Sequence, residues 1–335
     1  MSDRRYFAAS NSTVGFKSYY PQVFGGCRRV YVIKGGPGTG KSRFFSDVAQ
    51  HSREKVLYFC SSDPDSLDGV ILDGNVALID GTAPHIWEPG VVGAFEQIVN
   101  LGDFWDADAL AARREEIESL SAQKAGCYDD AYAYLAALGR AEEGISKRLL
   151  SCVNFEKLGR AAQKFLRGIR AETLPRREIG LSSSLGMKGE VSFDTYSKVR
   201  CPIAIDDPLG LSWLLLREME GLCERRGISM RLSHDPLFPS RLDAIELPNA
   251  GISFFIGKDG EGIPMRKFLR AEEFRSVRQE LRSVRAVQKK LRELALSALA
   301  DAARAHFALE EIYGATMDFG KKEKFTADFC NRLFG

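Results

Sequence analysis

The sequence predicts an α/β fold in which one parallel-sheet unit occurs twice, each copy followed by a helical hairpin or small bundle. Three observations predict it. A strand, a glycine-rich loop and a helix are indicated over residues 30–49. A weaker form of this pattern returns at residues 202–213, an offset of roughly 172 residues. Tracts rich in alanine, glutamate and arginine, with apolar residues at helical spacing, follow each copy at 91–170 and 266–335.

The glycine-rich loop is the strongest motif in the chain. Residues 35–42 read Gly-Gly-Pro-Gly-Thr-Gly-Lys-Ser and fit G-x-x-x-x-G-K-[ST], the Walker A or phosphate-binding (P-loop) pattern. Backbone N–H groups can converge on an anion only where side chains are absent, and the following helix adds the positive end of its dipole. The structural alternative is a glycine-rich turn that binds nothing. The nucleotide-binding residues predicted from this motif are Gly35, Gly36, Pro37, Gly38, Thr39, Gly40, Lys41, Ser42 and Arg43.

Two side chains of this motif carry its chemistry. Lys41 is expected to reach the β- and γ-phosphates of ATP, and the Ser42 hydroxyl to ligate Mg²⁺. Arg43 follows the motif directly, and we expect it to point to solvent or to form a salt bridge.

Length and composition indicate an ordinary globular protein of two domains. The chain has 335 residues, of which 44% are hydrophobic and 27% charged. Its 47 basic and 45 acidic residues give a net charge of +2, so no global basic field points to nucleic acid. Seven scattered cysteines without a C-x-x-C pair indicate a reducing compartment. No signal core and no apolar run of about 18 residues is present, so we expect a cytoplasmic protein with no membrane partner.

The first domain is predicted over residues 1–172. A polar lead-in precedes strands expected at 30–33, 56–60 and 75–79, and the helix after the loop is expected at 41–52. Prolines and glycine at 84–90 interrupt the pattern, and residues 91–170 are expected to form the helical extension.

The second domain is predicted over residues 173–335. Residues 173–192 read as a loop, and Ser182–Gly186 within it is similar to Ala9–Thr13. Ile252–Ile256 falls where Val76–Ile79 falls in the first copy. A long helical tract over about 266–335 closes the second copy, so a duplication of the whole unit is predicted.

The second copy differs from the first at the loop itself. Residues 206–213 contain one glycine and no lysine. Asp206 and Asp207 stand where phosphates would lie, and their charges would repel such a ligand. The second half is therefore predicted to hold no nucleotide and to serve as a structural or regulatory copy.

Asp80 is the predicted second ligand of the magnesium ion. It ends the apolar run 76–79, and a carboxylate at the end of a parallel strand beside the loop is the Walker B position. An ordinary Asp-Gly turn is the alternative. Many ATPases place a glutamate after this aspartate to activate water, whereas Gly81 follows here, which indicates slow hydrolysis.

Further polar residues follow the second and third expected strands. Asp63, Asp65 and Asp68 could act as a general base or contact a substrate hydroxyl or a cation, with Asp63 the first candidate; the alternative is a polar turn. Thr82 and His85 could sense the γ-phosphate, although a lone histidine is more often structural.

A basic stripe lies on the helix expected near 275–292. Its members are spaced three and four residues apart: Arg275, Arg278, Arg282, Arg285, Lys289 and Arg292. It is the only feature that hints at nucleic acid. A solvated helix edge, or pairing with Glu115, Glu116 and Glu118, accounts for it better because the net charge is near zero.

Three segments taken together, 33–42, 60–69 and 78–85, resemble an uncharacterised bacterial P-loop ATPase-like family, also nucleotide-kinase-like, of anaerobic and spore-forming Gram-positive bacteria. The resemblance implies two tandem copies of the unit and nucleotide binding, and it supplies no substrate. In that family the second copy commonly has a P-loop of its own, from which this sequence departs.

The sequence therefore predicts an ATP- and Mg²⁺-binding P-loop protein, a hydrolase that cleaves ATP slowly in its first half only. Two alternatives stay open. One is a small-molecule or nucleotide kinase that uses Asp63 as base, and the other is a nucleotide sensor without turnover whose helical arms move on binding. A protein partner or self-association is compatible with each.

Overall fold

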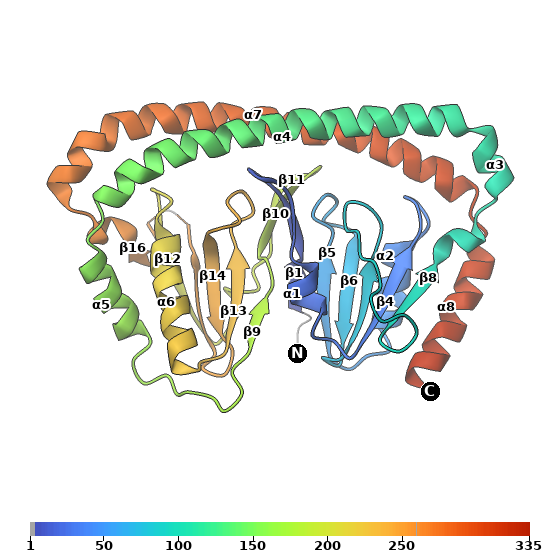
Figure 1. Ribbon diagram of the computed structural model, residues 1–335, viewed down its shortest axis with the longest axis horizontal. Helices are drawn as coiled ribbons and strands as arrows, with labels where there is room; N and C mark the ends of the chain where they lie inside the picture. The colour runs from blue at the N-terminus through green and yellow to red at the C-terminus, as the bar shows by residue number, and fades with distance from the viewer. Residues whose placement is uncertain (1–3, 259) are drawn as a thin grey trace.

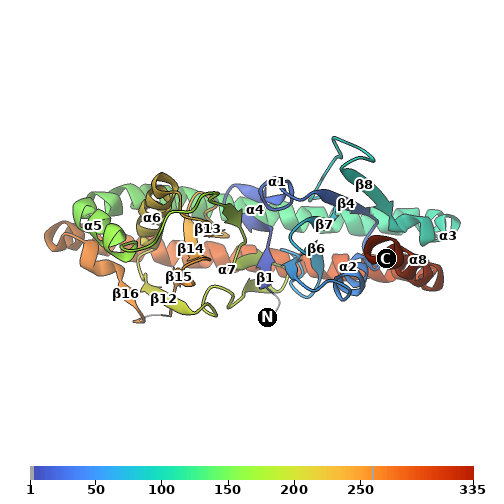
Figure 2. The same ribbon diagram turned by 90° about the horizontal axis from the view of Figure 1, so that it is seen from below.

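Two sheet domains lie side by side beneath a pair of long helices in the computed structural model, which describes residues 4–258 and 260–335 (Figure 1). The long helices α4 and α7 run over both domains, and the view from below shows them crossing the full length of the molecule (Figure 2). Within the described residues, no helix combines the length and the apolar character needed to cross a membrane.

The first sheet has six strands in the order β1-β5-β6-β7-β4-β8. Their bounds are Arg4–Phe7 (β1), Arg29–Lys34 (β4), Lys55–Phe59 (β5), Leu67–Leu72 (β6), Val76–Asp80 (β7) and Glu96–Asn100 (β8). The pairs β1–β5, β4–β7 and β4–β8 are parallel, whereas β6 runs antiparallel to both of its neighbours. The remaining elements of this domain are β2 (Ala9–Ser12), β3 (Gly15–Ser18), α1 (Tyr20–Phe24), α2 (Lys41–Ala49), η1 (Leu101–Phe104) and α3 (Ala107–Ala112).

The second sheet repeats this order and these strand directions place for place, as β9-β13-β14-β15-β12-β16. Its strands are Arg177–Ile179 (β9), Cys201–Asp206 (β12), Met230–His234 (β13), Leu242–Leu247 (β14), Ile252–Ile256 (β15) and Ile263–Pro264 (β16). The hairpin β10 (Ser183–Gly186) with β11 (Gly189–Ser192) and helix α6 (Ser212–Arg226) occupy the places of β2–β3 and α2. The chain is thus a mixed α/β protein with two six-stranded, mostly parallel sheets of one topology, as a duplication predicts.

Two local expectations differ from the structure. The segment 60–69 was expected to be a loop, but strand β6 begins at Leu67, where its neighbours in the sheet satisfy its backbone groups. The segment 173–192, also expected to be a loop, contains β9, β10 and β11.

The helical hairpin expected within residues 91–170 is also wrong. Residues 96–100 form strand β8, and most of the remainder is one continuous helix, α4 (Arg114–Ser151). Its partner is α7 (Ala271–Ala315) from the other half of the chain. At 1.5 Å per residue, the 38 residues of α4 span about 57 Å, which is long enough to cross both domains.

The two shorter helices that follow are exchanged between the domains. Helix α5 (Phe155–Phe165), which follows α4, packs in the core of the second domain through Leu158 and Ala162. Helix α8 (Phe319–Phe334), at the end of the chain, packs on the first domain, where the ring of Phe329 lies 5.2 Å from that of Phe44. Each core is therefore completed by a helix from the other half of the chain (Figure 1).

The two halves meet about an approximate two-fold axis. Phe7 and Leu181 exchange backbone hydrogen bonds of 2.9 and 3.0 Å, and the hydroxyl of Ser184 donates to that of Ser10 at 3.4 Å. Both pairs are separated by the same offset in sequence, which places them on the axis. As a result the β10–β11 hairpin of the second half reaches over the first domain, and the β2–β3 hairpin reaches over the second.

Candidate functional site

The glycine-rich loop connects β4 to α2 at the carboxyl edge of the first sheet. Gly38 and Gly40 have φ angles of 70° and 76°, in the left-handed region where a side chain is strained. Gly40 caps the helix, which begins at Lys41. The conformation therefore requires glycine at these positions and presents the first N–H groups of α2 toward the loop.

Lys41 folds back over this loop. Its Nζ donates to the carbonyl oxygens of Gly35 and Gly36, at 2.9 Å each, and lies 3.6 Å from Asp80 Oδ2. The Ser42 hydroxyl oxygen accepts a hydrogen bond of 2.9 Å from the backbone N–H of Leu67. The ammonium group is thus held mainly by backbone oxygens, which an arriving anion can replace.

Asp80 lies beside the loop because β7 is the parallel neighbour of β4, with Asp80 opposite Ile33. Its Oδ1 accepts hydrogen bonds from the backbone N–H and the hydroxyl of Thr82. Burial raises the pKa of Asp80, and the charge of Lys41 opposes this shift. Thr82 therefore orients the carboxylate from behind, and Oδ2 remains directed at Lys41.

The C-terminal part of α7 covers the loop. A Cβ atom on Gly38 would lie 2.3 Å from the carbonyl oxygen of Glu310, and one on Gly36 would lie 3.0 Å from the ring of Tyr313. The charge of Lys41 also acts on the Glu310 carboxylate. The glycines are thus needed for close packing of this helix as well as for the loop conformation.

Charged groups from both long helices gather above the loop. Lys124 comes from α4, and His306 and Glu310, 3.6 Å apart, come from α7. Burial and then the charge of Lys124 lower the pKa of His306 to about 4, and burial lowers the pKa of Lys124 itself. Burial, followed by the charge of Asp63, raises the pKa of Glu310. The charges of Lys41 and Asp63 also act on His306 and Glu310, so these groups form one electrostatically coupled cluster.

Asp63 is paired with a residue of the second half. Lys188, in the turn of the β10–β11 hairpin, places its Nζ 2.6 Å from Asp63 Oδ1 and 2.5 Å from Asp65 Oδ2. The hairpin is anchored by the backbone N–H of Met187, which donates to Ser62 at 2.9 Å. Burial would raise the pKa of Asp63, but the hydrogen bonds from Lys188 and Ser66 hold it below its ordinary value. Asp63 is therefore an ionised partner of Lys188 in this conformation.

Sequence reasoning did not find Lys188, Lys124, His306 or Glu310. Each is remote in sequence from the loop, and each reaches it only because the hairpins and long helices cross to the opposite domain. The similarity of Ser182–Gly186 to Ala9–Thr13 was the one signal that pointed toward the hairpin.

His85 pairs with Asp68. Its Nε2 is 2.9 Å from Asp68 Oδ2, and both side chains are buried. Burial alone would lower the pKa of His85, but the Asp68 carboxylate raises it above its ordinary value. Arg43 forms the salt bridge expected of it, with Asp47 at 2.9 Å, and is exposed.

The corresponding loop of the second half is filled by side chains of the chain itself. Asp207 accepts hydrogen bonds from the N–H groups of Leu211 and Ser212, at 2.8 and 2.6 Å, where α6 begins. Arg285 of α7 donates to the carbonyl oxygen of Leu209 at 2.9 Å and pairs with the buried Glu142 of α4. Built-in charged groups therefore occupy the positions that an anion would need.

The basic stripe does not form one surface. Arg285 turns inward to Glu142, while Arg275 pairs with Glu272 and Arg292 with Glu190. The expected pairing with the acidic residues near 115–118 is wrong, because Glu116 and Glu118 pair with Arg113 and Arg114 on their own segment.

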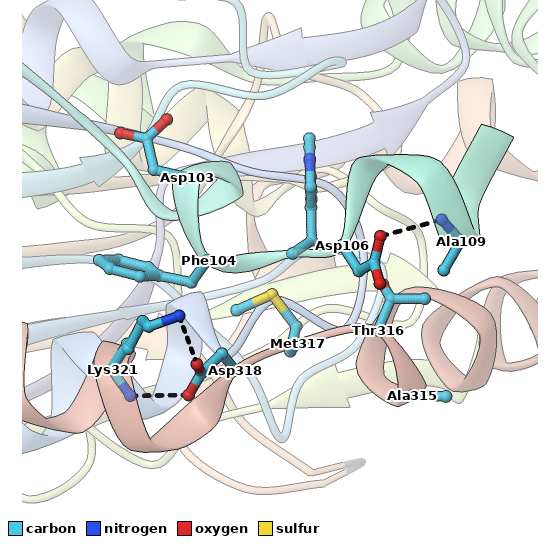
Figure 3. Close-up of a pocket in the computed structure, with 10 residues that line it drawn as sticks. Asp103, Phe104, Asp106, Ala109, Ala315, Thr316, Met317, Asp318 and Lys321 are labelled. Atoms are coloured by element: carbon cyan, nitrogen blue, oxygen red, sulfur yellow. Dashed lines mark hydrogen bonds and ion pairs between the residues drawn. The ribbon is translucent and has the colours of Figure 1, made fainter.

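A surface pocket of about 430 Å³ lies where α3 meets the end of α7, close to the part of α7 that covers the glycine-rich loop (Figure 3). Trp105 lines it, and the Trp105 ring lies 5.7 Å from that of Tyr313, which covers Gly36. Its charged residues are Asp103, Asp106, Asp318 and Lys321. Because Lys321 is paired with Asp318 at 2.9 Å, this pocket is acidic and does not suit a phosphate.

Comparisons with protein-family models, curated protein sequences and solved structures gave no match to this chain.

Proposed function

We propose that the first half of the chain binds ATP with Mg²⁺ and hydrolyses it slowly, while the second half binds no nucleotide. The observation that carries this proposal is the convergence of Lys41, Ser42 and Asp80 at one glycine-rich helix N-terminus. A fixed cation, a hydroxyl and a carboxylate in this arrangement are what phosphate and magnesium binding require.

The residues present fit these ligands chemically. The N–H groups at the start of α2 and the Lys41 ammonium would bind the phosphates, and Ser42 with Asp80 would hold Mg²⁺, which neutralises phosphate charge when bound. The Lys41 ammonium donates to the carbonyl oxygens of Gly35 and Gly36, so on binding it exchanges two neutral acceptors for negatively charged phosphate oxygens. The backbone of Glu310 packs directly on Gly38, so part of α7 must move when a nucleotide enters the loop.

Slow turnover follows from what surrounds Asp80. Gly81 and Thr82 follow it, and Thr82 is used to orient Asp80 itself. Asp63, the other carboxylate considered as a base, is held ionised by Lys188 with a lowered pKa, which makes it a weak base.

A kinase remains the second candidate, and one observation favours it. Lys188 pairs with Asp63, and the charge of Lys41 acts on Lys124, so an anionic acceptor near Asp63 would find cations beside the loop. The sensor alternative is favoured by the direct packing of α7 on the loop, because displacement of Glu310 would be transmitted along a helix that spans both domains.

Calorimetric titration of the full chain with Mg²⁺-ATP tests the proposal. We expect one nucleotide per chain and no measurable binding by Lys41→Ala, because the variant lacks the cation that neutralises the phosphates. Lys198→Ala, which removes an exposed lysine paired with Asp194, is the matched control and should bind as the parent does. Unchanged affinity of Lys41→Ala would refute the proposal.

Phosphate release then separates the three activities. Release without an added acceptor supports the ATPase, consumption of ATP only with a metabolite supports the kinase, and tight binding without turnover supports the sensor.

A further inference from the structure

We propose that Cys60, Asp68 and His85 form a binding site for a thiophilic divalent cation of the Zn²⁺ class, separate from the Mg²⁺ position at Ser42 and Asp80. One ligand atom from each of the three side chains lies within 4.8 Å of the other two. Asp68 and His85 are buried and Cys60 is partly buried, so the group is built into the domain.

The sheet brings these three residues together. Cys60 directly follows the end of β5, Asp68 lies at the start of the antiparallel β6, and His85 follows β7 by a short turn. Because β5, β6 and β7 are neighbours, all three side chains lie at one edge of the sheet. This is the edge that carries the glycine-rich loop, and the charge of Asp68 acts on Asp80.

Cys60 supplies the sulfur ligand of the group. Burial, followed by the charge of Asp68, raises the pKa of its thiol, so the thiol keeps its proton when no cation is bound. A divalent cation supplies the positive charge missing beside Asp68 and deprotonates a thiol that coordinates it.

His85 is fixed in position but incompletely satisfied. Its ring is stacked on Tyr20 at 4.8 Å and meets the edge of Phe16 at 5.0 Å. Nε2 faces Asp68, whereas Nδ1 is buried without a hydrogen-bond partner, although the side chain is only 6% exposed. Leaving a buried polar atom unpaired costs about 1–3 kcal/mol. Nδ1 is therefore a nitrogen whose capacity to bind a ligand is unused within the described residues.

The donor set selects the ion. Sulfur and imidazole nitrogen favour Zn²⁺ over Mg²⁺, and a thiolate with a carboxylate neutralises a divalent charge, which suits a buried position. On binding, the thiol proton and the second proton of an imidazolium leave to solvent. Three protein ligands leave a fourth coordination position for water or a substrate.

Titration of the full chain with Co²⁺ alone and with Zn²⁺ alone, under reducing conditions, tests the site. We expect one ion per chain and, for Co²⁺, the near-ultraviolet charge-transfer absorption of a cobalt–thiolate bond. Cys60→Ser should abolish that absorption, and His85→Gln should weaken Zn²⁺ binding at least ~10-fold. Cys201→Ser, which removes an exposed cysteine, is the matched control and should change neither.

Two further measurements distinguish loss of the metal site from loss of nucleotide binding and from failure of a variant to fold. Lys41→Ala should retain the metal, so loss of nucleotide binding and loss of metal binding are distinguishable. X-ray absorption at the zinc edge of the parent protein should show one sulfur ligand, even if Cys60→Ser fails to fold. A spectrum with no sulfur ligand, or the same cobalt absorption in Cys60→Ser, would overturn the proposal.

Discussion

The loops at the carboxyl edges of the two sheets occupy equivalent positions in the fold. They differ in whether a carboxylate of the loop binds the N–H groups at the start of the following helix. Gly38 and Gly210 occupy equivalent places and have φ angles of 70° and 71°. In the first loop the N–H groups at the start of α2 lie beside Lys41, and no carboxylate of the loop itself binds them. In the second, the Asp207 carboxylate already accepts the hydrogen bonds at the start of α6.

The helices above the loops extend this contrast. Over the first loop lie Glu310, which contacts Gly38, and the cations Lys124 and Lys188. Over the second, Glu142 is closed between Arg241 and Arg285 at 2.8 and 2.9 Å. The difference teaches that one sheet topology accommodates either a glycine-rich helix N-terminus or one that the chain fills with its own carboxylate and covers with a buried ion-pair network.

The largest expected effect comes from breaking that network. Glu142→Ala leaves Arg241 and Arg285 without a buried counter-charge and should lower the free energy of unfolding by about 3 kcal/mol. Glu118→Ala, on the same helix but exposed and paired with Arg114, should change it by less than about 0.5 kcal/mol. Urea denaturation measures both. Equal effects of the two variants would contradict the role given to the network.

The next effect concerns Asp243, the equivalent of Asp68. Asp68 has His85 as a partner, whereas Asp243 is buried among serine hydroxyls, and burial raises its pKa to about 7. A carboxyl group with a raised pKa stabilises the fold fully below its unfolded pKa near 3.8, and this contribution disappears as pH rises through 7. Stability should therefore fall by about 1 kcal/mol per pH unit between roughly pH 4 and 7.

Asp243→Asn tests this assignment because the amide does not titrate. Over this pH window, the free energy of unfolding of Asp243→Asn should decline much less than that of the parent. That of Asp194→Asn, at an exposed position, should decline as the parent's does. A parallel decline in the parent and in Asp243→Asn would show that other groups cause it.

The same contrast explains what could be predicted from the sequence. The strand–loop–helix unit at residues 30–49 and the position of Asp80 were predictable, because local spacing and strand direction fix them. A carboxylate at the second loop was predictable from Asp207, which accepts hydrogen bonds at the start of α6, whereas Asp206 accepts one from Gly260. Strand β6 was missed, because its first residues, 67–69, were assigned to the polar loop expected over residues 60–69.

The remaining features depend on long-range packing. The pairing of α4 with α7 and the exchange of α5 and α8 were not predictable, because an amphipathic helix does not specify its partner. Lys188 and Glu310 were missed for the same reason. The part of the site built from local sequence was thus accessible, and the part supplied by the other half was not.

A third comparison uses the equivalent glycines. Alanine at either position is strained by the positive φ, which costs about 1–2 kcal/mol. At Gly38 the new Cβ would also lie 2.3 Å from the backbone oxygen of Glu310, whereas at Gly210 it would lie 3.1 Å from the side chain of Arg285. Gly38→Ala should therefore destabilise the chain more, by about 1 kcal/mol, and weaken ATP binding. Thermal unfolding with and without Mg²⁺-ATP measures both, and equal stability losses would contradict the tight packing of α7 on the first loop.

The smallest expected effect concerns Lys188, the residue of the second half that pairs with Asp63. This prediction rests on ATP hydrolysis at the first-half site. The Lys188 side chain is 38% exposed, so its pair with Asp63 adds little to stability. The free energy of unfolding of Lys188→Ala should therefore lie within about 1 kcal/mol of the parent's. If its charge steadies Asp63 and the phosphates during hydrolysis, kcat should fall by about tenfold, equivalent to about 1.4 kcal/mol, with little change in KM. Lys188→Arg should restore part of kcat, and Lys198→Ala should match the parent. An unchanged kcat would limit the second half to a structural role, whereas the expected loss would mean that the copy without a cradle still supplies a cation to the copy that has one.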